Sequence, residues 1–230
     1  MPDRKNESRS VALVSGGLDS VVSLAAALEE TSVRLVLFFD YAQRALERER
    51  DAVAGVVNFY DLPFREVDVS WLGEISPDGM RRDGAENPGA PDSLDAVWIP
   101  NRNGVFLNVG AAYAERYDCD TLVTGFNREE AEEFPDNSAE YVTRANRALE
   151  MSTRTGVRVR SFTQELSKPE ILRYGAELGA PLSVIWSCYH GRSRMCGNCA
   201  SCLRLKAALV EVGEGVRPRL EFEDDGEVRS

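Results

Sequence analysis

The chain has 230 residues, of which 43% are hydrophobic and 28% are charged, a composition typical of one globular α/β domain with a small appendage. It contains no apolar run of about 18 residues or more, and the segment from Met1 to Ser10 lacks the apolar centre of a secretion signal. We therefore expect a cytoplasmic protein with no membrane contact. The formal net charge of −11 argues against direct nucleic-acid binding, because nucleic-acid phosphates repel an acidic surface.

The first part of the chain alternates between strand and helix patterns. Short apolar runs over 10–14 and 33–39 and an alternating run over 64–69 predict strands. Apolar residues recur at helical spacing over 21–28 and again over 47–60. Strands separated by helices predict a Rossmann-like parallel sheet with helices on both faces.

The second part continues this alternation after an irregular segment. Residues 76–95 are rich in Pro, Gly, Asp and Arg, which predicts a mobile functional loop or a disordered insert. The elements expected beyond it are helices over 103–116, 140–155, 168–178 and 200–210, and strands over 120–125 and 157–162. We expect a nucleotide-binding domain over 1–185, a metal-binding segment with its following helix over 186–212, and a loosely held acidic tail over 213–230.

A glycine-rich turn separates the first strand from the first helix. It reads Ser15, Gly16, Gly17, Leu18, Asp19 and Ser20. A glycine pair lets backbone N–H groups converge at the positive end of a helix, which favours an anion. Serine hydroxyls can add donors, and Asp19 can hold Mg²⁺ or orient the loop. The turn therefore predicts a pyrophosphate site; the alternative is a plain turn with Asp19 as a helix cap.

Four of the five cysteines cluster near the C-terminal end: Cys188, Cys196, Cys199 and Cys202. In a cytosolic chain such clustering favours a metal over disulfides. Four thiolates at this spacing suit tetrahedral Zn²⁺ and leave it no open position, so we expect a structural zinc site. An iron–sulfur cluster and a redox dithiol are the alternatives. His190 is either a further ligand or a loop residue, and Cys119 is expected to be an ordinary buried thiol.

The glycine-rich turn resembles the loop of the PP-loop ATP pyrophosphatase superfamily (adenine nucleotide alpha hydrolase-like), whose members cleave ATP to AMP and pyrophosphate. With the cysteine cluster, the chain resembles the 7-cyano-7-deazaguanine synthase (QueC) family along most of its length. The supporting segments are 39–44 (FDYAQR), 100–103 (PNRN), 125–127 (GFN), 134–138 (FPDNS), 166–171 (LSKPEI) and 186–189 (WSCY).

This resemblance implies an ATP-dependent carbon–nitrogen ligase in queuosine or archaeosine biosynthesis. Its substrates would be the small deazapurine 7-carboxy-7-deazaguanine and ammonia. An adenylylated carboxylate and an amide would precede the nitrile. The resemblance also implies ATP with Mg²⁺, a structural zinc ion and a homodimer.

The resemblance assigns roles to single residues as well. It implies that the glycine-rich turn and Lys168 hold the ATP phosphates, although Lys168 could also be a surface residue beside a helix start. Arg102 would face the substrate carboxylate or the phosphates, because its fork of donors suits either oxyanion. Gln43 and Arg44 follow the second strand, at the sheet edge where such folds bind ligands.

Asp136 and Asn137 are expected to read the guanine-like edge of the substrate, because a carboxylate can accept from an N–H and an amino group together. The segment before them reads Arg-Glu-Glu-Ala and departs from the shorter form common in the family. Its Glu129 and Glu130 belong either to a solvated helix face or to the site.

Two other classes of protein fit parts of the sequence. A PP-loop relative would adenylylate another substrate, either a tRNA or a protein partner. For a tRNA thiolase, Cys119 is the only spare thiol and the acidic charge is unfavourable. A zinc-ribbon binding module without catalysis would leave the glycine-rich turn unexplained.

Overall fold

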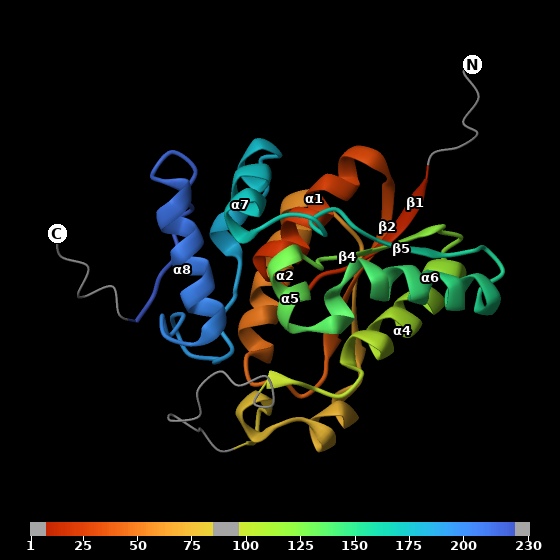
Figure 1. Ribbon diagram of the computed structural model, residues 1–230, viewed down its shortest axis with the longest axis horizontal. Helices are drawn as coiled ribbons and strands as arrows, with labels where there is room; N and C mark the ends of the chain where they lie inside the picture. Colours follow the sequence, from red (N-terminus) through yellow and green to blue (C-terminus); the bar gives the residue numbers. More distant parts are fainter. Residues whose placement is uncertain (1–7, 85–96, 224–230) are drawn as a thin grey trace.

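The computed structural model describes residues 8–84 and 97–223, which form a parallel five-stranded sheet with helices on both faces (Figure 1). The strands are β1 (Arg9–Leu13), β2 (Ser32–Asp40), β3 (Phe64–Asp68), β4 (Thr121–Thr124) and β5 (Arg158–Ser161). Their order is β3-β2-β1-β4-β5, and every pairing is parallel. The predicted Rossmann-like class is confirmed: the chain moves outward from β1 to β3, then crosses to the other side for β4 and β5.

The helices lie close to their predicted positions. They are α1 (Leu18–Glu30), α2 (Leu46–Tyr60), α4 (Arg102–Arg116), α5 (Arg128–Glu133), α6 (Ala139–Ser152), α7 (Lys168–Glu177) and α8 (Ala200–Val212). Short 3-10 turns occur at Ser70–Ile75, Asp78–Met80, Pro135–Asn137 and Leu182–Val184. The acidic α5 was not predicted, because it has no apolar face. No helix in the described ranges is long and apolar enough to cross a membrane.

Alternation along the strands builds two cores. On one face Ala12, Val36 and Phe38 pack with α1, α2, α7 and α8. On the other face Val11 and Leu37 pack with α4 and α6. Figure 1 shows α7 and α8 side by side at one end of the molecule, with α4 and α6 at the other. Both faces are thus covered, as a parallel sheet requires.

The segment after α8 packs back onto the cysteine segment. Phe222 is 2% exposed and forms a β-bridge with Met195, with Met195 N donating to Glu221 O (3.2 Å) and Glu223 N to Met195 O (2.8 Å). Residues 221–223 of the expected loose tail are therefore held against the cysteine segment by a buried aromatic ring and two backbone hydrogen bonds. The end of the tail, 224–230, lies outside the described residues, as does 85–95 of the predicted loop.

Candidate functional site

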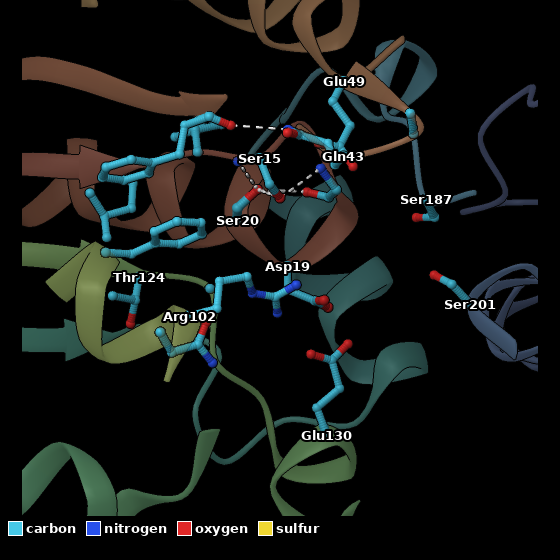
Figure 2. A pocket seen from close by; sticks show the side chains of 18 of the residues that line it. Ser15, Asp19, Ser20, Gln43, Glu49, Arg102, Thr124, Glu130, Ser187 and Ser201 are labelled. Carbon is cyan, nitrogen blue, oxygen red and sulfur yellow. Dashed lines mark hydrogen bonds between the residues drawn. The ribbon is translucent and has the colours of Figure 1, made fainter. Parts of the chain in front are cut away.

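A cavity of about 250 Å³ lies at the carboxyl ends of β1, β2 and β4 (Figure 2). The chain changes direction across the sheet between β1 and β4, and open α/β sheets hold ligands at such switch points. The predicted site residues that line this cavity are Ser15, Gly17, Leu18, Asp19, Ser20, Gln43, Arg44, Arg102, Asn137 and Lys168. The fold therefore gathers residues from five separate segments of the sequence around one space.

The glycine-rich turn connects β1 to α1 at the floor of the cavity. Gly16 has a φ of +83°, and a Cβ there would lie 2.8 Å from Ala52 Cβ on α2, so a larger residue would clash. Gly17 is the N-cap of α1 and provides no side-chain cap. Asp19 lies within the first turn of α1 and is not its cap, which leaves the helix N-terminus available to an anion.

The two serines of the turn bond to each other and to the backbone. Ser20 Oγ donates to Gly17 O (3.0 Å) and accepts from Ser15 N (3.2 Å). The Ser15 and Ser20 hydroxyls lie 3.3 Å apart, and Ser15 is exposed. Ser20 therefore stabilises the turn, while Ser15 can reach a ligand.

Lys168 joins this floor from the start of α7. It is 8% exposed, and its ammonium donates to Asp19 Oδ2 and to Glu130 Oε1, the latter at 2.9 Å. Its backbone N donates to Glu129 Oε1 (2.7 Å). The surface alternative for Lys168 is therefore wrong. Of the two neighbouring glutamates of α5, Glu130 lines the cavity, whereas Glu129 accepts from the backbone at the start of α7.

Burial and neighbouring charge shift the pKa values of this trio. Burial, opposed by Lys168 and reinforced by Glu130, raises the pKa of Asp19 to about 6. For Glu130, burial is outweighed by the Lys168 ammonium, so its pKa is lowered. Burial alone would lower the pKa of Lys168, but the Asp19 and Glu130 carboxylates raise it. At pH 7 the site therefore holds one buried cation between two carboxylates.

Arg102, the first residue of α4, extends into the middle of the cavity (Figure 2). Its guanidinium lies over the Tyr41 ring, 5.5 Å from the centroid. Burial would lower the pKa of Arg102, but Tyr41, Asp136 and other nearby acidic groups raise it. Its buried Nε has no hydrogen-bond partner among the described residues. Arg102 is thus a cation at the cavity wall, and a guanidinium is suited to binding an oxyanion.

Gln43 and Arg44 bond mainly to the protein itself. Gln43 is 2% exposed and donates to Phe39 O (3.0 Å) and Glu49 Oε2 (2.9 Å), while its Oε1 accepts from Tyr41 N (2.8 Å). Arg44 donates to the carbonyl oxygens of two residues in the 78–84 segment, at 3.1 and 2.9 Å. These contacts shape the turn after β2, at the wall of the cavity.

Glu49 of α2 was not predicted as a site residue. It lines the cavity near Gln43, and burial raises its pKa to about 7 despite the Gln43 hydrogen bond and the Arg102 charge. Its helix begins with alternating acidic and basic residues, a pattern typical of a solvated face, so the sequence gives no signal for it. Tyr189 and Ser201, each next to one of the clustered cysteines in the sequence, also line the cavity and were missed.

Asp136 lies in a second, smaller cavity of about 130 Å³, whose lining includes Asn137 and Arg102. Asn137 is 6% exposed and its Nδ2 donates to Asp136 Oδ1 (3.3 Å). Burial raises the pKa of Asp136, and the Arg102 charge opposes that rise. The two residues predicted to read a guanine-like edge thus lie together, next to the space that the glycine-rich turn lines.

The four clustered cysteines form a compact group. Cys188, Cys196, Cys199 and Cys202 are buried, and their sulfur atoms all lie within 4.8 Å of one another. The distance between Cys196 Sγ and Cys202 Sγ is 3.9 Å, close to the ~3.8 Å edge of a zinc–thiolate tetrahedron with bonds of about 2.3 Å. The group can therefore bind a metal ion.

Hydrogen bonds around the cluster also suit thiolates. The backbone N atoms of His190 and Cys196 donate to Cys188 Sγ, and Cys199 N donates to Cys196 Sγ, each at 3.3 Å. Among the described residues the His190 ring is not part of the ligand group. Cys119 is a separate buried thiol, as predicted.

A short segment links the cluster to the glycine-rich turn. Trp186 N donates to Gly16 O (2.9 Å), and the indole Nε1 donates to Cys188 O (2.9 Å). Ser187 and Tyr189, on either side of Cys188, line the large cavity. The metal-capable cluster is therefore part of the wall that holds the turn in place.

The fold and the site together define a Rossmann-like α/β protein with an anion-binding turn at the sheet edge and a four-cysteine cluster capable of binding a metal. The chain belongs to the QueC family: the family described as "Queuosine biosynthesis protein QueC" matches residues 9–213. This confirms the resemblance of the sequence segments.

Curated relatives agree over nearly their whole length. The chain is 48% identical over 216 residues to a protein of Pelotomaculum thermopropionicum named 7-cyano-7-deazaguanine synthase, which covers 89% of this chain and 98% of the relative. It is 41% identical over 219 residues to a protein of the same name from Methanosarcina barkeri, covering 89% and 95% of the two chains. The chain is thus a member of an enzyme family, and neither relative supports a non-catalytic zinc-ribbon module.

Solved structures show a weaker likeness. The U34-tRNA thiolase NcsA from Methanococcus maripaludis, solved with its [4Fe-4S] cluster, has a TM-score of 0.49 and 12% sequence identity, covering 90% of this chain and 65% of that chain. A likeness at this level has no bearing on the ligand or substrate of this chain.

Proposed function

We propose that the chain is an ATP-dependent ligase that converts 7-carboxy-7-deazaguanine and ammonia to 7-cyano-7-deazaguanine. The observation that carries this proposal is the meeting of the glycine-rich turn, the Asp19–Lys168 pair and Arg102 at one cavity, in a chain 48% identical to a relative named for this product. The glycine-rich turn and the cations of Lys168 and Arg102 suit the phosphates of a nucleotide. The second cavity offers room for the substrate that accepts the adenylyl group.

In the first step an oxygen of the substrate carboxylate attacks the α-phosphorus of ATP, and pyrophosphate leaves. The backbone N–H groups at the start of α1 and the Ser15 hydroxyl would hold the departing pyrophosphate. Arg102 would align the carboxylate and neutralise charge as the oxygens approach. Lys168, held between Asp19 and Glu130, would place a positive charge beside the phosphates.

Ammonia then attacks the acyl carbon, AMP leaves, and an amide forms with loss of a proton. A second ATP would adenylylate the amide oxygen, and loss of AMP and a proton would give the nitrile. Both steps transfer an adenylyl group to an oxygen atom, first of the carboxylate and then of the amide, so a single site can perform both. Mg²⁺ bound with ATP would supply charge neutralisation, and Asp19 would help to hold it.

We further propose that the four cysteines hold a structural zinc ion. Their spacing and sulfur-to-sulfur distance fit zinc, and four protein ligands would leave no open position for chemistry. The partners would be the deazapurine and ammonia, without direct nucleic-acid contact, and the chain would act as a cytoplasmic homodimer.

The test is incubation of the purified chain with 7-carboxy-7-deazaguanine, ammonium and Mg-ATP. Mass spectrometry should detect the nitrile, together with AMP and pyrophosphate, and omission of ammonium should leave no nitrile. Absence of the nitrile from a chain that binds ATP would contradict the proposal and favour a related adenylylation of a protein or tRNA.

A further inference from the structure

The proposed reaction removes every hydrogen from the nitrogen of ammonia. One proton leaves when ammonia displaces AMP and the amide forms. The amide nitrogen then loses its remaining protons in two steps, one as the amide oxygen is adenylylated and one as AMP departs. The site therefore needs a group near the acyl carbon that repeatedly accepts a proton from nitrogen and passes it to solvent.

Three carboxylates line the larger cavity: Asp19, Glu49 and Glu130. Asp19 and Glu130 share one cation, because the Lys168 ammonium donates to both. Glu49 instead accepts from the neutral amide of Gln43 (2.9 Å), and it forms no salt bridge within residues 8–84 and 97–223. A carboxylate paired with a cation is a weaker base than one without such a partner. Of the three, Glu49 is therefore the most suitable proton acceptor.

Gln43 holds Glu49 by one of its two carboxylate oxygens. The Gln43 amide is itself fixed at both ends, since its Nε2 donates to Phe39 O (3.0 Å) and its Oε1 accepts from Tyr41 N (2.8 Å). The same Nε2 donates to Glu49 Oε2, while Glu49 Oε1 accepts no hydrogen bond in the described part of the chain. One oxygen is thus anchored, and the other is available to an N–H group of a substrate.

Glu49 is close to both the glycine-rich turn and Arg102, around one space (Figure 2). Its backbone packs on the turn, because a Cβ at Gly16 would lie 3.1 Å from Glu49 O. The Arg102 charge lowers the pKa of Glu49, and the Glu49 charge raises the pKa of Arg102, so the two side chains are near neighbours. A substrate carboxylate aligned by Arg102 would therefore present its acyl carbon near Glu49.

We propose that the Glu49 carboxylate is the catalytic group that accepts the protons lost by nitrogen, first from ammonia and then from the amide. In the first step the nitrogen lone pair forms the C–N bond, AMP leaves with the C–O electrons, and the N–H electrons return to nitrogen. In the later steps the N–H electrons form the second and third C–N bonds. This assignment rests on the proposed function, and it makes Gln43 a positioning residue.

The ionisation of Glu49 suits this exchange. Burial raises the pKa of Glu49 to about 7, against the Gln43 hydrogen bond and the Arg102 charge. Glu49 in turn raises the pKa of the nearby Tyr41 hydroxyl. Near neutral pH both forms of Glu49 are populated, so the group can accept a proton and release it within one turnover. In acid the carboxyl stays protonated and cannot accept, so nitrile formation should slow down.

Glu49→Gln tests the assignment by separating the two halves of the reaction. The new amide oxygen can still accept from Gln43, but the side chain cannot take up a proton. Exchange of pyrophosphate into ATP, measured with 7-carboxy-7-deazaguanine and without ammonium, should remain at the wild-type level. Amide and nitrile formation should fall by about 10²-fold or more, because a general base is lost. Glu47→Gln, whose carboxylate on the same helix is 74% exposed, is the matched control and should behave as the wild type.

The pH dependence of the second half gives a readout that a merely structural role would not change. With the amide as substrate, free ammonia does not enter the rate. The wild-type rate of nitrile formation should rise with pH up to about 7 and then level off. The residual rate of Glu49→Gln should lack this break, and Glu49→Asp, which keeps a carboxylate, should retain the break and part of the rate.

Three results would overturn the assignment alone: nitrile formation by Glu49→Gln at the wild-type rate, an equal loss of pyrophosphate exchange in this variant, or an unchanged break in its pH profile. A wild type that neither exchanges pyrophosphate nor makes the nitrile would instead contradict the proposed function.

Discussion

The floor of the large cavity and the cysteine cluster deal with charge in opposite ways. On the floor, Lys168 lies between Asp19 and Glu130, so each buried carboxylate has a cation of the protein beside it. The cluster gathers four groups of one kind, whose sulfur atoms lie within 4.8 Å of one another. As thiolates they would repel one another, and only a bound cation can balance them.

This difference indicates which region needs a ligand in order to fold. The cavity floor carries compensated charge and can keep its geometry before any substrate binds. With the metal ion proposed above, the cluster would depend on that ion, since metal binding and folding are coupled in sites of this kind. One region is therefore preorganised for chemistry, and the other contributes to the stability of the fold.

Disruption of the cluster should have the largest effect. We expect Cys202→Ser to lose the metal and to lower Tm by roughly 10 °C or more, since structural zinc contributes several kcal/mol to folding. Metal analysis and thermal unfolding measure both quantities. Cys119→Ser is the matched control: it also removes a buried thiol but should keep its metal. A Cys202→Ser chain with full metal content would refute the structural role.

A change on the cavity floor should affect catalysis and spare the metal. We expect Asp19→Ala to reduce AMP release by about 10²–10³-fold, because a preorganised charged group beside the phosphates is lost. Metal content should remain that of the wild type. Asp51→Ala, whose carboxylate is 74% exposed on α2, should leave AMP release unchanged. Normal turnover by Asp19→Ala would show that the glycine-rich turn is not the site of ATP chemistry.

The smallest effect concerns pH. Burial raises the pKa of Glu49 from 4.5 to about 7, so the fold favours the protonated carboxyl. The contribution of Glu49 to the free energy of unfolding is complete below pH 4.5 and is lost as the pH rises through about 7. The loss should lower the free energy of unfolding by up to roughly 3 kcal/mol. Glu49→Gln has no group that ionises at this position, so its free energy of unfolding should not show this decrease with rising pH.

Urea unfolding at pH 5 and pH 8 measures the difference between the two chains. The wild type should lose more unfolding free energy than Glu49→Gln between these pH values. Asp51→Asn serves as the exposed control and should follow the wild type. Parallel pH profiles for wild type and Glu49→Gln would show that Glu49 is solvated in solution.

Features encoded locally could be predicted from the sequence. The strands, most helices, the glycine-rich turn and the four cysteines all depend on residues close together in the chain. Residues whose burial and contacts depend on partners far away in the sequence could not be predicted in this way. Glu130 looks solvated in its acidic helix, and only Lys168, 38 positions later, makes it part of the site. Glu49 looks solvated for the same reason, until α2 packs beside the turn after β2.

The role of Gln43 illustrates a second limit. Its position after β2 indicated a ligand contact. In the structure, however, its amide N donates to Phe39 O and Glu49, and its amide O accepts from Tyr41 N. Sequence position places a residue at the sheet edge, whereas hydrogen-bond partners decide which way it faces.

A backbone hydrogen bond from Trp186 N to Gly16 O, two residues before Cys188, joins the cysteine segment to the glycine-rich turn. Loss of the metal would loosen this segment and, with it, the neighbour that holds the glycine-rich turn. We therefore expect oxidants and chelators to weaken nucleotide affinity before the chain unfolds. The activity of the enzyme would then depend on the supply of metal and on oxidation of the cysteine thiols. The link between them would be the Trp186 peptide group, which is a ligand of neither the metal nor the nucleotide.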